Sequence, residues 1–123
     1  MESQWSLLKE VKINNNHIEA LADVPVDSPW FSGHFPGQPI LPGIALVYMA
    51  EQAIIQDALA KGEQVQLHAL KRVRFTQPVR PVETLSLNIV SEESGEDILF
   101  SFKITNKENI VCSGVIVAKK INK

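Results

Sequence analysis

The chain has few of the features that would cross-link it or carry it into a membrane. Cys112 is its only cysteine, so no internal disulfide can form. No group of Cys and His stands at ligand spacing, and we expect no structural zinc site. The longest apolar run ends at Pro42 on one side and Glu51 on the other, which is too short to span a bilayer. The first residues lack a basic stretch followed by an apolar core, so we expect no secretory signal and a cytoplasmic protein.

The chain also lacks an excess of either charge. Its formal net charge is −2, which argues against nucleic-acid binding by bulk electrostatics. Hydrophobic residues make up 45% and charged residues 21%, the composition of an ordinary folded domain. From the length of 123 residues we expect one domain, spanning residues 1–123.

The sequence does contain a concentration of proline and glycine before an apolar segment. Three prolines and three glycines fall within residues 33–43, namely Gly33, Pro36, Gly37, Pro39, Pro42 and Gly43. Proline fixes φ and glycine permits positive φ, so this segment has one defined, non-repetitive path. It carries one histidine, His34, and leads directly into the apolar run that begins at Ile44. We therefore expect a rigid loop that holds His34 beside the N-terminus of a buried helix.

The pattern predicts that this helix runs from about Gly43 to about Lys61. Gly62 is suited to end a helix, and Lys61 suits the negative end of the helix dipole. Residues 44–50 are apolar on every face, which predicts burial all round. Polar residues then return and predict a partly exposed second half: Glu51, Gln52, Gln56 and Asp57.

The other patterned segments alternate as strands do. An N-terminal hairpin is expected around residues 14–16, and further strands at residues 66–75, 85–89, 98–104 and 111–117. Turns are expected over residues 92–97 and 106–109. The last strand has apolar residues on both faces, so we expect both to be covered. A sheet whose inner face needs covering and one mostly apolar helix predict an α+β domain, with the sheet curled around the helix.

Two segments resemble the 3-hydroxyacyl-[acyl carrier protein] dehydratases of fatty-acid synthesis, a hotdog-fold family. Residues 31–43 read FSGHFPGQPILPG and match the family signature G-H-F-P-G-x-P-[ILVM]-[LM]-P-G, which an apolar helix follows. Residues 74–81 read RFTQPVRP and resemble the family's F-x-x-P-V-x-P, although Val82 stands where the family usually has Gly. The resemblance implies a hotdog fold, in which an antiparallel sheet wraps one long central helix.

The resemblance also implies roles for individual residues. His34 would be the general base that takes the α-proton of a 3-hydroxyacyl thioester, since an imidazole titrates near neutral pH. The backbone N–H of Gly43, at the start of the helix, would polarise the thioester carbonyl. Phe31, Gly33, Phe35 and Pro42 would line the substrate. The reaction would be elimination of water to the trans-2-enoyl thioester, without an organic cofactor or a metal.

Position 48 departs from the family pattern, because Tyr48 stands where the family has a Glu or Asp on the helix. A phenol has a reference pKa of about 10, so it can donate a hydrogen bond or a proton but cannot act as a carboxylate at pH 7. Tyr48 is equally explained as a core aromatic residue whose hydroxyl finds a partner. Glu51, one turn further along the helix, is an alternative acid, or it marks where the helix becomes solvated.

The family further implies partners and an assembly. The substrate would arrive on the phosphopantetheine arm of an acyl carrier protein, and the basic residues Lys71, Arg72, Arg74 and Arg80 could meet that acidic partner. A homodimer with two sites at the subunit interface is expected, and a trimer of dimers is common in the family. Two alternatives stay open: a hotdog thioesterase in which Glu51 activates water, and a non-catalytic acyl-binding or partner subunit.

Overall fold

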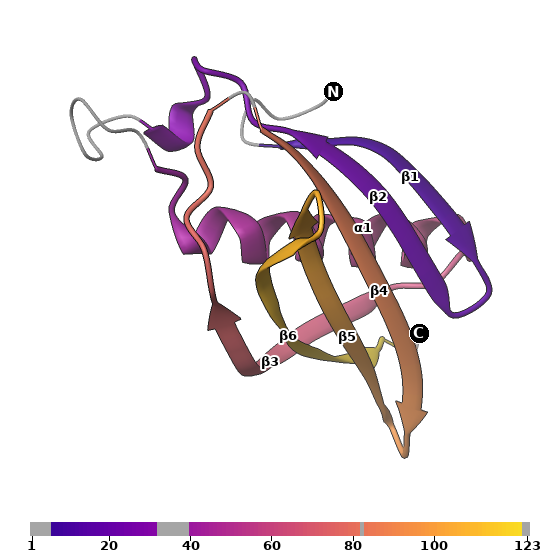
Figure 1. Cartoon of the computed structure of the whole chain (residues 1–123). Coiled ribbons are helices and arrows are strands. Elements are labelled where there is room, and N and C mark those ends of the chain that lie inside the picture. The colour runs from indigo at the N-terminus through magenta and orange to yellow at the C-terminus, as the bar shows by residue number, and fades with distance from the viewer. Residues whose placement is uncertain (1–5, 32–39, 82, 122–123) are drawn as a thin grey trace.

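The computed structural model describes residues 6–31, 40–81 and 83–121 (Figure 1). Its elements are β1 (Leu8–Asn14), β2 (His17–Asp23), the short 3₁₀ helix η1 (Pro29–Phe31), α1 (Gly43–Ala60), β3 (Val65–Phe75), β4 (Thr84–Ser94), β5 (Asp97–Asn106) and β6 (Asn109–Lys120). The strands form one antiparallel sheet in the order β1-β2-β4-β5-β6-β3. β3 follows the helix in sequence but lies at the far edge of the sheet, beside the last strand.

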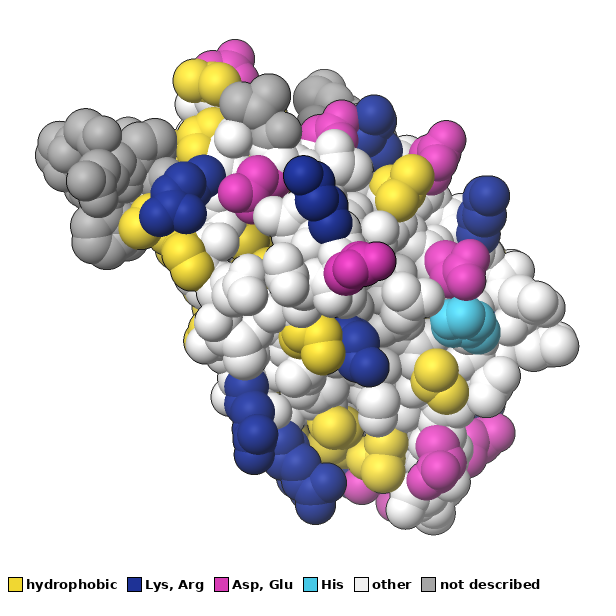
Figure 2. All heavy atoms as spheres, viewed as in Figure 1, with side chains coloured by type: hydrophobic (Ala, Val, Ile, Leu, Met, Phe, Trp, Pro, Cys, Tyr) yellow, Lys and Arg dark blue, Asp and Glu magenta, His cyan; other side chains and the backbone are white. Residues whose placement is uncertain are grey.

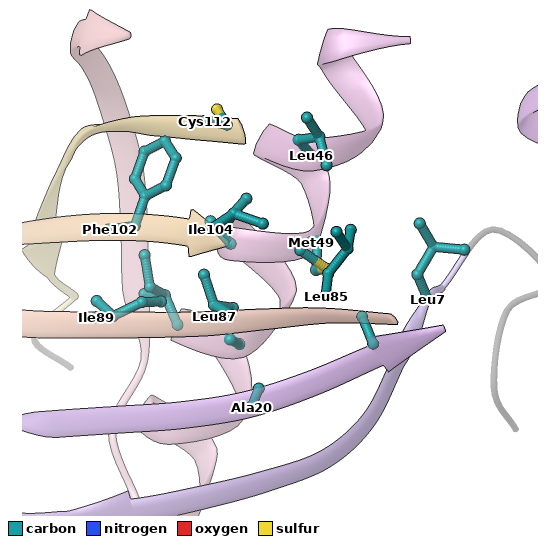
Figure 3. Packing of buried hydrophobic residues seen from close by; sticks show 14 of the residues in the cluster. Leu7, Ala20, Leu46, Met49, Leu85, Leu87, Ile89, Phe102, Ile104 and Cys112 are labelled. Atoms are coloured by element: carbon teal, nitrogen blue, oxygen red, sulfur yellow. The ribbon is translucent and has the colours of Figure 1, made fainter. Parts of the chain in front are cut away.

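The sheet curves around α1, which lies across its concave face (Figure 1). Leu46 and Met49 of the helix point toward Leu85, Leu87 and Ile104 of the sheet (Figure 3). All five are at most 3% exposed, so the helix and the sheet share one apolar core. The predicted hotdog arrangement is confirmed. In the described part of the chain no helix is long and apolar enough to cross a membrane.

The predicted bounds of the helix are confirmed, but two predictions about its exposure are wrong. Ile44, predicted to be buried, is 63% exposed, because the sheet covers only one side of the first turn. Asp57, predicted to lie on a solvated face, is only 5% exposed, because its carboxylate forms an ion pair with Lys61. Gly62 follows the helix with φ of +71°, the left-handed conformation expected of a residue that ends a helix.

The strands lie where they were predicted, but they are longer. The predicted turn around Gly95 is confirmed, but its predicted extent over residues 92–97 is too wide, since β4 continues to Ser94 and Glu92 pairs with Leu99. Gly95, with φ of +64°, makes the tight connection that allows this pairing. On β6 the consecutive residues Ile116, Val117 and Ala118 are all buried, so both faces are covered there as predicted. Val111 and Cys112 are also buried, at a register shift in the pairing with β5.

The strand β3 forms one edge of the sheet and has little cover. Leu70 is 48% and Phe75 is 54% exposed, although both strand positions pair with buried residues of β6. A β-bulge interrupts the pairing between Lys71 and Arg74, and Arg72 within it has φ of +55°, which is uncommon for a residue with a side chain.

Candidate active site

The two segments that carry the family resemblance meet at the start of α1. The backbone N–H of Leu41 donates a hydrogen bond of 2.7 Å to the carbonyl of Val79. Both residues are buried, at 3% and 1% exposure, so this bond is shielded from water. It fixes the approach to the helix against the segment that follows β3, and thereby positions Gly43.

The N-terminus of α1 carries no cap from a side chain. Pro42 occupies the N-cap position with φ −63° and ψ 146°, and proline has no side-chain acceptor. The first turn contains no acidic residue, and the described bond near it runs from the N–H of Ala45 to the carbonyl of Pro42. The positive end of the helix dipole is therefore available to a negatively charged oxygen placed beside Gly43.

An apolar groove of about 550 Å³ opens at this helix end. Ile40, Gly43, Ile44, Phe75 and Val79 line it, and Thr76 and Gln77 add polar groups. The ring of Phe75 lies against Gly43, so closely that a Cβ on residue 43 would be 2.8 Å from two ring carbons. A glycine at position 43 therefore allows an aromatic ring to pack onto the first turn, in a groove that suits an acyl chain.

Tyr48 lies one turn further along the helix and does not line this groove. Its ring is partly buried and contacts the ring of Trp30, with the ring centroids 5.8 Å apart and the planes at 57°. Trp30 comes from η1, the last described element before residues 32–39. The helix position of the family acid is thus occupied by one half of an aromatic pair.

Glu51 is partly buried on the same helix, and burial raises the pKa of its carboxyl above the usual 4.5. It also lies outside the groove at the helix start. A raised pKa suits a carboxyl that must hold a proton, but no described hydrogen bond joins Glu51 to Tyr48. Glu51 therefore lies away from the groove beside Gly43, and its role as the alternative acid stays a prediction.

The remaining predicted residues divide between described and undescribed segments. His34, Gly33 and Phe35 lie outside the described residues, and so does Val82. Pro42 directly precedes the groove, and Phe31 packs in partly buried form against the core. Within the described segments no three His, Cys, Asp or Glu side chains come together in a way that could hold a metal ion.

The predicted docking residues Lys71, Arg72, Arg74 and Arg80 are all exposed. In Figure 2, neighbouring Lys and Arg side chains lie at the lower left, over the region where Figure 1 places β3. Elsewhere on this face, basic and acidic side chains alternate (Figure 2). A local concentration of positive charge therefore accompanies β3, in a chain whose net charge is −2.

Two features of the site were missed by sequence reasoning. The contact of Trp30 with Tyr48 joins segments on either side of the Pro- and Gly-rich loop. The packing of Phe75 on Gly43 joins two motifs that had been found separately. The motif F-x-x-P-V-x-P was the available signal for Phe75, whereas the sequence held no comparable signal for Trp30.

Comparison with known proteins gives consistent results. The family model described as ApeI-like, ApeI dehydratase, matches residues 10–115. A 3-hydroxyacyl-[acyl-carrier-protein] dehydratase FabZ of Rickettsia massiliae is 30% identical over 110 residues, which cover 85% of this chain and 76% of that protein.

Among solved structures, the dehydratase heterocomplex ApeI:P from Xenorhabdus doucetiae is similar with a TM-score of 0.72 and 24% identity, covering 93% of this chain and 97% of that one. An uncharacterized protein, PH1136 from Pyrococcus horikoshii, has a TM-score of 0.78 at 21% identity, covering 96% of this chain and 86% of that one. At these identities the structural likeness concerns the fold.

Proposed function

The chain belongs to the ApeI-like dehydratase family and is a dehydratase-like hydro-lyase, and we propose which residues perform the elimination. The substrate is a 3-hydroxyacyl thioester on an acyl carrier protein, and the product is the trans-2-enoyl thioester. The observation that carries this proposal is the uncapped N-terminus of α1, which opens on an apolar groove. Such an end stabilises the negative charge that develops on the thioester oxygen.

In this reaction His34 accepts the proton from the α-carbon, and the electron pair of that bond moves toward the thioester carbonyl. The N–H of Gly43 donates a hydrogen bond to the carbonyl oxygen as it gains charge. The electron pair then forms the carbon–carbon double bond while the hydroxyl group leaves from the β-carbon. Tyr48 lies outside the groove of its own chain, so we assign this role to the Tyr48 of a second copy of the chain at a shared site. It donates a proton to the leaving group, which departs as water, and proton exchange with solvent restores both side chains.

Incubation with a 3-hydroxyacyl carrier-protein thioester tests the reaction, because loss of one water lowers the mass of the acyl group. The control is His34→Ala, which removes the base and should lower turnover by about 10²–10⁴-fold. The thermal unfolding midpoint of this variant should stay near that of the wild type. A variant with turnover within about threefold of the wild type would show that another group takes the proton.

We further propose that the working unit is a homodimer, which could assemble into a trimer of dimers. The support is a set of exposed apolar side chains on α1 and on the edge strand β3, namely Ile44, Ile55, Leu59, Leu70 and Phe75. Exposed apolar area of this kind on a sheet edge favours association with another copy. Light scattering of a stable monomer at micromolar concentration would contradict a site shared between subunits.

A second candidate function is that of a partner subunit beside a chain that supplies the missing carboxylate. Tyr48 at the position of the family acid favours this alternative. The similar structure from Xenorhabdus doucetiae is that of a dehydratase heterocomplex, ApeI:P. If the chain alone is inactive, and elimination begins when a second hotdog chain with a helix carboxylate is added, this candidate replaces the homodimeric enzyme.

Carrier docking and location complete the proposal. Charge reversal of Lys71 or Arg74 should raise the KM for the carrier-linked substrate with little change in kcat, because both residues are exposed on β3. A carrier-linked substrate and a single cysteine accord with a cytoplasmic protein.

We regard residues 1–123 as one domain, since one apolar cluster joins α1 to β2, β4, β5 and β6.

A further inference from the structure

Tyr48 is held by a side chain from outside its own helix. The separation of 5.8 Å between the rings of Trp30 and Tyr48, and their tilt of 57°, fall in the range that aromatic pairs favour. Trp30 is itself partly buried and packs against the core, so the indole is not a freely moving neighbour. The phenol ring therefore has a packed surface on one side.

The backbone around Trp30 is braced by Ser28, a polar residue that is only 5% exposed. The hydroxyl oxygen of Ser28 accepts a hydrogen bond of 3.4 Å from the N–H of Trp30. The backbone carbonyl of Ser28 accepts one of 3.1 Å from the N–H of Phe31. The N–H of Ser28 donates to the carbonyl of Pro25 at 3.2 Å. These bonds hold η1 in one conformation and set the direction from which the indole approaches Tyr48.

We propose that Trp30 is a positioning residue for Tyr48, which limits the phenol to the rotamer that presents its hydroxyl to the leaving group. This inference rests on the proposed function, in which Tyr48 gives up that proton. A phenol has one donor at the end of a rigid ring, so a change in side-chain rotamer moves the hydroxyl far from the leaving group. Small displacements of a reacting group lower rates strongly, and a neighbouring ring that removes alternative rotamers avoids that loss.

The first arm of the test observes the ring and does not depend on activity. Tyr48 is the only tyrosine, so labelling of tyrosine gives one set of NMR signals. The couplings between Hα and Hβ should report a single χ1 rotamer in the wild type and in Trp30→Phe, which keeps an aromatic contact. They should be averaged in Trp30→Ala. A single unchanged rotamer in Trp30→Ala, with the fold intact, would overturn the proposal.

The second arm measures turnover of the 3-hydroxyacyl carrier-protein thioester. Trp30→Ala should lower kcat by about tenfold with little change in KM, and Trp30→Phe should restore most of it. In a Tyr48→Phe background, Trp30→Ala should cause no further loss, because there is no hydroxyl left to position. An equal loss in both backgrounds would mean that Trp30 acts independently of Tyr48 and would overturn the proposal.

The control is Val26→Ala, a change at a residue that is 69% exposed in the same segment, and it should alter neither measurement. A wild type without any elimination activity would refute the proposed function. The rotamer measurement would then still decide whether Trp30 orients the ring.

Discussion

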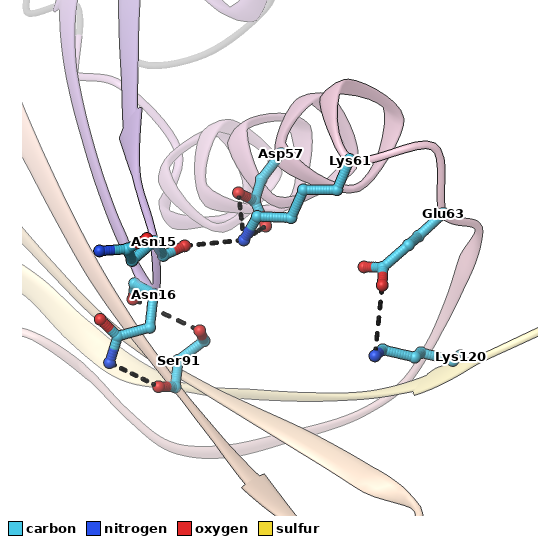
Figure 4. A network of polar contacts seen from close by, with 7 residues as sticks. All are labelled: Asn15, Asn16, Asp57, Lys61, Glu63, Ser91 and Lys120. Atoms are coloured by element: carbon cyan, nitrogen blue, oxygen red, sulfur yellow. Dashed lines mark hydrogen bonds and ion pairs between the residues drawn. The ribbon is translucent and has the colours of Figure 1, made fainter.

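The C-terminal end of α1 is closed by hydrogen bonds and ion pairs, whereas its N-terminal end has neither a capping side chain nor an acidic residue. At the C-terminal end, the Lys61 ammonium lies 3.0 Å from Oδ1 of buried Asp57 and donates a hydrogen bond of 2.8 Å to the carbonyl of Asn15 (Figure 4). The N–H of Glu63 donates to the carbonyl of Ala58 at 2.8 Å. The bond from Lys61 to Asn15 fastens this end of the helix to the β1–β2 hairpin, and the other two contacts close the helix end itself.

The N-terminal end is fastened differently. One buried backbone bond, from Leu41 to Val79, holds the chain just before the helix, and the first turn itself faces an open groove. The C-terminal end of the helix is thus anchored through polar groups that have partners, and the proposed function uses the N-terminal end, where a cap from a side chain is lacking. Substitutions at the C-terminal end should therefore change stability, and substitutions near the N-terminal end should change activity.

The largest effect is expected at Tyr48. Tyr48→Phe removes only the hydroxyl and should lower turnover by about 10²-fold or more if this group is the acid. The unfolding midpoint should change little, since the ring and its contact with Trp30 remain. Tyr48→Glu, which restores the family pattern, should raise the elimination rate. A silent Tyr48→Phe would identify Tyr48 as a packing residue only.

Asp57→Ala should lower the free energy of unfolding by about 1–2 kcal/mol, because it removes a charged hydrogen-bonding partner of Lys61. The midpoint would then fall by about 4–8 °C, measured by calorimetry. Lys61→Met should cost at least as much, since it leaves the buried carboxylate of Asp57 without its described partner. Turnover per folded molecule should stay unchanged in both variants. If either variant lost turnover but kept its unfolding midpoint, the assignment of stability to the C-terminal end and activity to the N-terminal end would be wrong.

Gly43→Ala should lower activity by about tenfold while changing the midpoint by only a few degrees. The new methyl group would meet the Phe75 ring at 2.8 Å, so the ring must shift, and Phe75 lines the groove proposed to receive the substrate. The ring is half exposed and can move, which keeps the cost in stability small. Phe75→Leu in the same chain should recover activity by making room. No recovery would mean that the methyl group itself obstructs the site.

The smallest effect is expected at Glu51, through pH. Its raised pKa means that the folded state holds the proton more tightly than the unfolded state. The stabilising contribution is fully present below about pH 4.5 and is lost as the pH rises through the raised pKa. Between about pH 4 and pH 7 the free energy of unfolding of the wild type should therefore fall slightly relative to that of Glu51→Gln, by less than about 1 kcal/mol. If Glu51→Gln instead abolishes thioester hydrolysis, Glu51 activates water and the protein is a thioesterase.

Local pattern was enough to predict the helix and the positions of the strands, because periods of 3.6 and 2 residues follow directly from backbone geometry. It could not predict which side of α1 the sheet leaves uncovered, so the exposure of Ile44 was missed. Nor could it predict that Lys61 neutralises Asp57 and permits its burial. The partner of Tyr48 depends on how η1 packs against α1, a tertiary arrangement that no periodicity records.

The strand order has a kinetic meaning for the newly made chain. Among the described strands β3 pairs with β6 alone, and β6 is synthesised after the other five. Until that strand is available, the apolar residues of β3 have no neighbour in the sheet, and the helix lacks part of its cover. Such late pairing between distant segments slows folding and leaves the nascent chain open to aggregation. Truncation within β6 would therefore remove two strand pairings, with β3 and with β5, and should prevent folding altogether.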